Sequence, residues 1–185
     1  MRRPIVLASS NPTKRRQLRW LLEGLPLDPV EPTAPLGVPE TSSNLTGNAA
    51  AKALTYSGGG LAVASDGGLV VPALAVAWDP LLTGREGQAG LRRLAAGLAD
   101  RRVRWSEAVA IAEGGHIVAA WTASGTEGLL APEPWPEPSD FWVWDIFYFP
   151  SLGKLWSALT ENERTEVDST WMELKRQVQA YFRAG

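Results

Sequence analysis

The sequence predicts an α/β fold in which a mixed sheet carries helices on its faces. Two patterns predict this fold class. Residues 5–24 run from an apolar strand through a polar loop into an amphipathic helix, which is the order in which many α/β proteins begin. Later in the chain, Gly114-Gly115 separates two apolar runs and indicates a β-hairpin. With 185 residues, of which 45% are apolar, the chain is expected to form a single domain over residues 1–185.

The elements of the first third follow from apolar spacing and from the residues that end helices. Ile5–Ala8 is expected to be a short buried strand, and residues 14–23 a helix that ends at the following glycine. Five prolines over residues 26–40 indicate an extended loop or an edge strand. Residues 44–57 are rich in alanine and are expected to form a second helix, which ends at a run of three glycines.

The middle of the chain contains a motif with two interpretations. Strands are expected over residues 61–65 and 69–71, on either side of Asp66-Gly67-Gly68. That tripeptide is typical of an ordinary hairpin turn. Alternatively, Asp66 is a carboxylate at the carboxyl end of a strand, where α/β proteins bind ligands. Residues 88–98 have the apolar spacing of another helix.

The last third combines a hairpin, an aromatic strand and a terminal helix. The hairpin is expected to pair residues 103–112 with residues 116–124, and a strand is expected over Phe141–Phe149. Thr160 and Glu163 have the spacing of a capping box, which begins a helical C-terminus. The apolar stripe of that C-terminus consists of Trp171, Leu174, Val178, Tyr181 and Phe182.

Composition excludes several classes of function. The net charge of −2 does not predict a broad nucleic-acid surface, and no apolar run is long enough to cross a membrane, so neither partner is expected and the location is expected to be cytoplasmic. The absence of Cys excludes thiolate sites, and His116 as the one His excludes a two-histidine metal site. Carboxylates, hydroxyls, Lys and Arg remain, together with a hard metal ion held by oxygen atoms.

The first loop and helix carry a cluster of positive charge. Lys14, Arg15 and Arg16 lie in the first helical turn, where the helix dipole disfavours cations. A polyphosphate bound at the helix N-terminus would explain this arrangement. The alternative is a solvated basic face, which costs about a few tenths of a kcal/mol per residue.

Polar residues on the second helix and next to it suggest a second part of the site. Asn48 and Lys52 are four residues apart and therefore lie on one helix face, although an alanine-rich helix with a solvated Lys has the same pattern. Glu40 follows the proline-rich segment, and together with Asp66 it could hold Mg²⁺. Farther along, Trp142 and Trp144 would share one face of a strand and could stack on a base or pack in the core.

Taken together and in this order, the motifs resemble the inosine triphosphate pyrophosphatase family. Ile5–Lys14 is similar to the family's strand followed by TGNxxK, and Asn48–Ala53 to its ENAxxKA segment. Ala64–Val71 is similar to its DDSGLxV segment, and Trp142–Asp145 to its FGYD or FGWD segment. The resemblance covers nearly the whole chain and implies an elongated central sheet with two lobes around a cleft.

The resemblance also implies an activity and a role for each matching residue. Such enzymes hydrolyse a nucleoside triphosphate, usually a deaminated purine nucleotide, to the monophosphate and pyrophosphate with Mg²⁺, and they are usually homodimers. Asp66 and Lys52 would be catalytic, and Glu40 and Asp66 would bind the metal. The triphosphate would be bound by Ser9, Ser10, Asn11, Lys14, Lys52, Gly67 and Arg164, and the base by Trp142, Trp144 and Asp145.

Two departures from the family pattern bear on specificity and activity. The first Asp of the family's DD pair is Ser65 here, which removes one carboxylate near the metal. The family's late SHR triplet, whose His and Arg read the 6-keto edge of the purine, falls at Asp168-Ser169-Thr170. The base preference is therefore expected to be altered. The alternative is a catalytically silent nucleotide-binding or interaction protein on the same fold.

Overall fold

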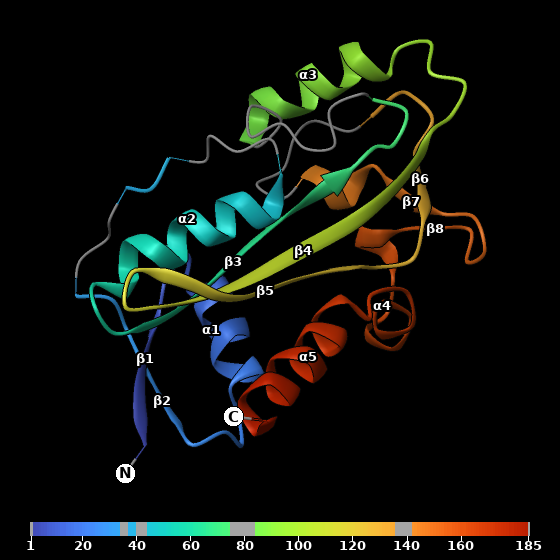
Figure 1. The fold of residues 1–185 in the computed structure, drawn as a ribbon. Coiled ribbons are helices and arrows are strands. Elements are labelled where there is room, and N and C mark those ends of the chain that lie inside the picture. The colour runs from blue at the N-terminus through green and yellow to red at the C-terminus, as the bar shows by residue number, and fades with distance from the viewer. Residues whose placement is uncertain (1, 34–36, 40–43, 75–83, 136–141, 185) are drawn as a thin grey trace. The chain divides into compact units, whose positions relative to one another are not determined.

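The fold is described from a computed structural model, in which the described residues are 2–33, 37–39, 44–74, 84–135 and 142–184 (Figure 1). The elements of the first half are β1 (Arg3–Leu7), α1 (Pro12–Leu21), β2 (Leu27–Val30), α2 (Leu45–Ser57), β3 (Leu61–Val70) and α3 (Gly84–Ala95). The elements of the second half are β4 (Arg102–Glu113), β5 (His116–Ser124), β6 (Gly128–Leu130), the 3₁₀ helix η2 (Trp142–Asp145), β7 (Phe147–Phe149), β8 (Lys154–Leu155), the 3₁₀ helix η3 (Trp156–Ala158), α4 (Glu161–Val167) and α5 (Thr170–Ala184).

The predicted fold class is confirmed, because the strands form a mixed sheet accompanied by helices. Over the described residues the strand order is β2-β1-β3-β4-β6-β7-β8, and β5 pairs with β4. Strand β1 is parallel to both β2 and β3. The pairs β4–β6, β6–β7 and β7–β8 are antiparallel. Strand β2, which contains Pro29, lies at the end of this order, and proline within a sheet is largely confined to such edge strands.

The chain divides into two compact units. The first unit contains residues 1–67, 107–123 and 170–185, and the second contains residues 68–106 and 124–169. Strands β3 and β4 each contribute residues to both units.

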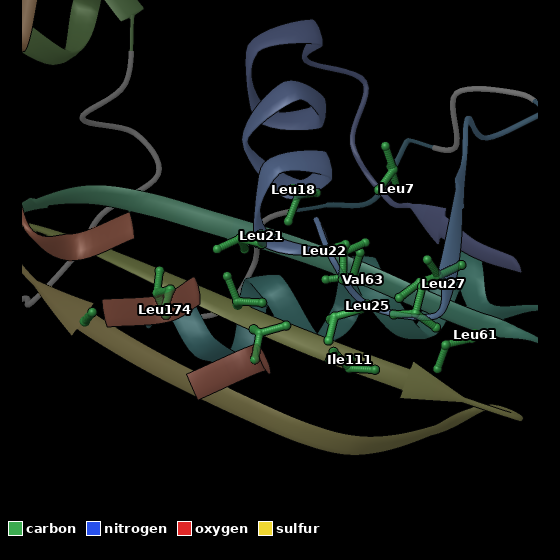
Figure 2. Close-up of a cluster of buried hydrophobic side chains, with 14 residues drawn as sticks. Leu7, Leu18, Leu21, Leu22, Leu25, Leu27, Leu61, Val63, Ile111 and Leu174 are labelled. Atoms are coloured by element: carbon green, nitrogen blue, oxygen red, sulfur yellow. The ribbon is translucent and has the colours of Figure 1, made fainter. Parts of the chain in front are cut away.

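In the first unit, leucines of α1 fill the core against β1, β3, β4 and α5. Figure 2 shows Leu18 and Leu21 of α1, and Leu22 directly after it, in one buried cluster with residues of these other elements. The helical spacing i, i+3, i+4 puts these three leucines on one face, as the sequence predicts. Helices α1 and α5 lie side by side in this unit.

Local signals begin and end the elements of the first unit. The Asn11 side chain caps α1 by accepting hydrogen bonds from the backbone N–H groups of Thr13 and Lys14. Helix α2 is capped by Asn44 and ends at Gly58, whose φ of 52° is left-handed. Strands β4 and β5 are joined at Gly114-Gly115, where both residues have positive φ, so the predicted hairpin is confirmed.

Strand β3 corrects one prediction. The sequence suggests two strands separated by a turn at Asp66-Gly67-Gly68, but β3 is unbroken over Leu61–Val70. Neighbouring strands pair with β3 on both sides, β1 on one and β4 on the other, and nearly all of its residues are buried. Pairing with β1 at Ala62 and Val63 and with β4 on the other side holds β3 in the sheet, and this tertiary context overrides the local turn preference of the glycines. The hairpin-turn interpretation of this tripeptide is therefore wrong.

The second unit has its own aromatic core, which corrects the predicted strand over Phe141–Phe149. Within the described residues, Trp142–Asp145 forms a 3₁₀ turn and only Phe147–Phe149 is a strand. The N–H of Ile146 donates to the carbonyl of Val143 and so closes the turn. Trp142 is buried in this core, whereas Trp144 stacks on Trp156 with ring centroids 4.6 Å apart.

Two C-terminal features follow the prediction. Helix α4 begins with the expected capping box between Thr160 and Glu163. Leu174 and Val178, from the predicted apolar stripe of α5, are buried in the core of the first unit. Trp171 and Phe182 of the same stripe pack against this core. Among the described residues, no helix is both long enough and apolar enough to cross a membrane.

Candidate functional site

The register between β1 and β3 places Asp66 beside the first loop. The two strands are parallel, with Val6 opposite Ala62 and Leu7 opposite Val63. The N–H of Ala8 continues this pairing by donating to the carbonyl of Val63. The chain leaves β1 at Leu7, while β3 continues past Val63 toward Asp66. The residues that follow β1 therefore meet the carboxyl half of β3, which is where parallel α/β sheets bind ligands.

Asp66 is a buried carboxylate held by groups from α2. The Lys52 ammonium lies 2.8 Å from Oδ1 of Asp66, and Nδ2 of Asn48 donates to Oδ2 at 3.1 Å. The Lys14 ammonium lies 3.7 Å from Oδ1. The predicted shared face of Asn48 and Lys52 is confirmed, and that face is directed at Asp66. A buried carboxylate is costly without such partners, so these residues form a coupled unit.

The loop between β1 and α1 is held in shape from both ends. The Asn11 side chain satisfies free N–H groups of the first helical turn. The Arg15 guanidinium donates to the carbonyls of Ser9 and Ser10 at 3.0 and 2.9 Å. These hydrogen bonds turn the two carbonyl oxygens toward the guanidinium of Arg15 and hold the loop in one conformation.

This loop borders a polar cleft within the first unit. The cleft has a volume of about 290 Å³. Its lining consists of Ala8, Ser9, Ser10, Asn11, Lys14, Gly37, Val38, Lys52 and Tyr56. The charged residues of this described lining are Lys14 and Lys52, both cations. The predicted triphosphate residues from the first loop and from α2 therefore share one cleft, and its charge suits an anion.

The basic cluster of α1 is only partly directed at this cleft. Arg15 and Arg19 form ion pairs with Glu31 at 2.5 and 2.9 Å. Arg16 donates to the Thr13 hydroxyl. An acidic partner distant in sequence thus accounts for two of the arginines, and Lys14 is the residue of the first turn that lines the cleft.

Sequence reasoning missed Glu107, which lies at the same site. It is 2% exposed, and its Oε1 lies 3.7 Å from the Lys14 ammonium. A Cβ added to Gly67 would overlap the Glu107 carboxyl group, so the two residues are in close contact. The available signal was an acidic residue within the apolar run of β4, because carboxylates are rarely buried without a partner.

Other predicted site residues lie in the second unit or outside the described residues. Arg164 is an exposed residue of α4. Trp142 is 2% exposed in the core of the second unit, and Asp145 ends the turn η2 next to Trp144. Their proposed roles toward triphosphate and base stay predictions. Glu40 lies outside the described residues, and no group of three or more His, Cys, Asp or Glu that could hold a metal occurs within the described part of the chain.

Comparison with known proteins gives consistent matches over almost the whole chain. The model of the Ham1 family matches residues 5–172. The dITP/XTP pyrophosphatase of Prochlorococcus marinus (strain MIT 9313) is 31% identical over 172 residues, which cover 89% of this chain and 84% of the relative.

Two solved structures extend this comparison to the fold. The HAM1 protein from Coxiella burnetii has a TM-score of 0.76 at 29% identity and covers 99% of this chain and 100% of its own. The nucleoside-triphosphatase / dITP/XTP pyrophosphatase from Mycobacterium abscessus ATCC 19977 / DSM 44196 has a TM-score of 0.69 at 25% identity, with coverage of 96% and 97%.

Proposed function

Since this chain belongs to the Ham1 family, we propose that it is a nucleoside triphosphate pyrophosphatase, which hydrolyses its substrate to the monophosphate and pyrophosphate with Mg²⁺. The observation that carries the proposal is the convergence of Lys14, Lys52 and Asn48 on the Asp66 carboxylate beside a polar cleft. The name of the Prochlorococcus marinus relative, a dITP/XTP pyrophosphatase, supports the same reaction.

Different residues of the first unit have different roles in this reaction. Ser9, Ser10 and Asn11 line the triphosphate cleft, and the ammonium groups of Lys14 and Lys52 neutralise phosphate charge there. Gly67, next to Asp66 on β3, would contact the phosphates through its backbone. In the hydrolytic step, a water oxygen forms a bond to the α-phosphorus, and the bond from that phosphorus to the bridging oxygen of the β-phosphate breaks. Pyrophosphate is the leaving group.

Asp66 orients the attacking water and accepts its proton at a carboxylate oxygen. Lys52 holds this carboxylate in place through the 2.8 Å contact. Asn48 fixes the second oxygen of the same group. Proton transfer by a positioned carboxylate contributes about 10²–10⁴-fold to a rate, and charge neutralisation supplies much of the remainder in phosphoryl chemistry.

The chemistry of the donors fits a magnesium ion. Magnesium is usually bound through one or two carboxylates together with phosphate oxygens of the substrate. Asp66 offers a buried carboxylate in contact with Lys14 and Lys52 of the cleft lining, and Glu40 is the second ligand that the family resemblance implies. When bound, Mg²⁺ would neutralise the triphosphate and polarise its phosphoryl oxygens.

The base preference is proposed to be altered relative to the family. The base-reading His and Arg correspond here to Ser169 and Thr170, and Thr170 is fully buried. Neither side chain can replace the guanidinium of Arg, which stays charged and donates its hydrogen bonds in a fixed fork. Trp142, Trp144 and Asp145 are proposed to bind the base, and Arg164 is proposed to contact phosphate. A homodimer is proposed as well, and sedimentation of the full chain tests it.

The experiment that tests the function is pyrophosphate release from a panel of nucleoside triphosphates with Mg²⁺. Inosine, xanthosine and deoxyuridine triphosphates belong in the panel beside the four standard ribonucleotides. Release from at least one of them supports the proposal. No release from any of them contradicts it. In that case, a change in tryptophan fluorescence on nucleotide addition would identify a silent nucleotide-binding protein, the alternative on the same fold.

A further inference from the structure

We propose that Glu107 is the second carboxylate of the divalent-cation site beside Asp66, and that Gly67 is the residue that makes room for it. The inference rests on the proposed function, because that reaction calls for the cation. In this site Glu107 of β4 takes the place of Glu40, the second ligand that the family resemblance implies. Three features of the first unit support it.

The first feature is a position that already holds a positive charge between two buried carboxylates. The Lys14 ammonium lies 3.7 Å from Oδ1 of Asp66 and 3.7 Å from Oε1 of Glu107. Both acidic residues are 2% exposed. At 3.7 Å, each contact is an ion pair longer than an ordinary hydrogen bond. The ammonium therefore stands where a cation is attracted by both carboxylates, and its own contacts with them are loose.

The second feature is the space that the Glu107 carboxyl group occupies. A Cβ on Gly67 would overlap both carboxylate oxygens and Cδ of Glu107, closer than real contacts permit. Gly67 lies within β3 and does not have the positive φ that favours glycine elsewhere in this chain. Its lack of a side chain is therefore required by the carboxylate and not by the backbone.

The third feature is the cost of burying the Glu107 carboxylate at the start of the apolar stretch of β4. Its neighbours along β4, Ala108 to Ala112, are all fully buried apolar residues. An apolar side chain at position 107 would pack there without the desolvation penalty of a carboxylate. Position 65, where the family pattern has an acidic residue, is Ser in this chain. Strands β3 and β4 therefore contribute one carboxylate each, which matches the one or two carboxylates of a protein magnesium site.

The test is a titration of the full-length chain with Mn²⁺, followed by electron paramagnetic resonance, with and without inorganic pyrophosphate. This readout does not depend on turnover. Wild type is expected to bind one Mn²⁺ per chain at this site. Glu107→Gln is expected to weaken that binding at least about tenfold, the loss typical of metal-site residues. Gly67→Ala, which keeps both carboxylates, is expected to weaken it too by displacing one of them.

Glu113→Gln is the matched control. Glu113 is on the same strand, is about half-exposed, and pairs with Arg3 outside the site. It is expected to bind Mn²⁺ like wild type. Circular dichroism of every variant establishes whether it is folded. If Glu107→Gln does not fold, the Mn²⁺ affinity of Gly67→Ala is the test.

The outcomes separate this inference from the proposed function. Mn²⁺ affinity of a folded Glu107→Gln within twofold of wild type would overturn the inference, as would a wild type that binds no Mn²⁺ under either condition. Neither result touches pyrophosphate release by wild type. Conversely, Mn²⁺ binding that depends on Glu107 in a chain that releases no pyrophosphate would contradict the proposed function and keep the cation site.

Discussion

Lys52 and Asp66 form a 2.8 Å ion pair that joins α2 to β3 in the first unit. The Asp66 side chain is almost completely buried, whereas the Lys52 side chain is 15% exposed and lines the cleft. Asp66 therefore belongs to the protein interior, and Lys52 faces the cleft. The stability of the site and its chemistry therefore depend on the same contact.

Replacing Asp66 by Asn is expected to abolish most of the activity and to leave the fold intact. The amide keeps the shape of the side chain but cannot accept the proton of water. Pyrophosphate release should fall by about 10²–10⁴-fold. The control is Asp28→Asn on the exposed edge of β2, which should behave like wild type. Activity of Asp66→Asn within a few-fold of wild type would show that another group handles the proton.

Replacing Lys52 by Met is expected to destabilise the protein as well as to impair catalysis. Without Lys52 the buried carboxylate keeps only Asn48 and the more distant Lys14, and the loss of the short ion pair is expected to cost up to about 3 kcal/mol. The free energy of unfolding in urea measures this change. Arg3→Gln removes one partner of an ion pair whose side chains are both about half-exposed, and it should change stability far less. Equal losses in the two variants would contradict the coupling of Lys52 to a buried charge.

Two substitutions of Asn11 separate its capping role from its position at the cleft. Asn11→Ala removes the cap of α1 and should lower the free energy of unfolding by about 1 kcal/mol. Asn11→Asp retains a good capping residue but places a negative charge at the cleft. Its stability should therefore stay near that of wild type, while its KM for the triphosphate rises. An Asn11→Asp variant with an unchanged KM would place the phosphates away from this loop.

Acid is expected to destabilise the start of α4 through Glu163. The hydrogen bond from Lys154, followed by those from the backbone and hydroxyl of Thr160, lowers the pKa of Glu163 to about 2, from 4.5. The folded-state pKa lies below the unfolded value, so the ionised group stabilises the fold above pH 4.5. This contribution is lost as the pH falls from 4.5 toward 2.

Unfolding in urea at a series of pH values between 6 and about 2 measures this contribution. Glu163→Gln keeps a residue suited to a capping box but cannot ionise, so its stability should depend less on pH in that window. Glu166→Gln on the same helix is the matched control, because its exposed carboxyl group lies outside the capping box. A Glu163→Gln profile parallel to that of wild type would rule out this linkage.

The sequence by itself determined the features that depend on residues close together in the chain. The shared face of Asn48 and Lys52, the hairpin at Gly114-Gly115 and the capping box at Thr160 all follow from backbone geometry within a few residues. The order of motifs also identified the family. These predictions hold because local chemistry is sufficient to specify them.

Only the tertiary structure decided the features that depend on distant partners. Pairing with β1 and β4 kept Asp66-Gly67-Gly68 in a continuous strand. Glu31 forms ion pairs with two arginines of α1, and the neighbouring strand β4 places Glu107 beside Lys14. Each outcome is an electrostatic or hydrogen-bonding contact between residues at least a dozen positions apart, and its strength depends on burial and distance, which the fold alone supplies.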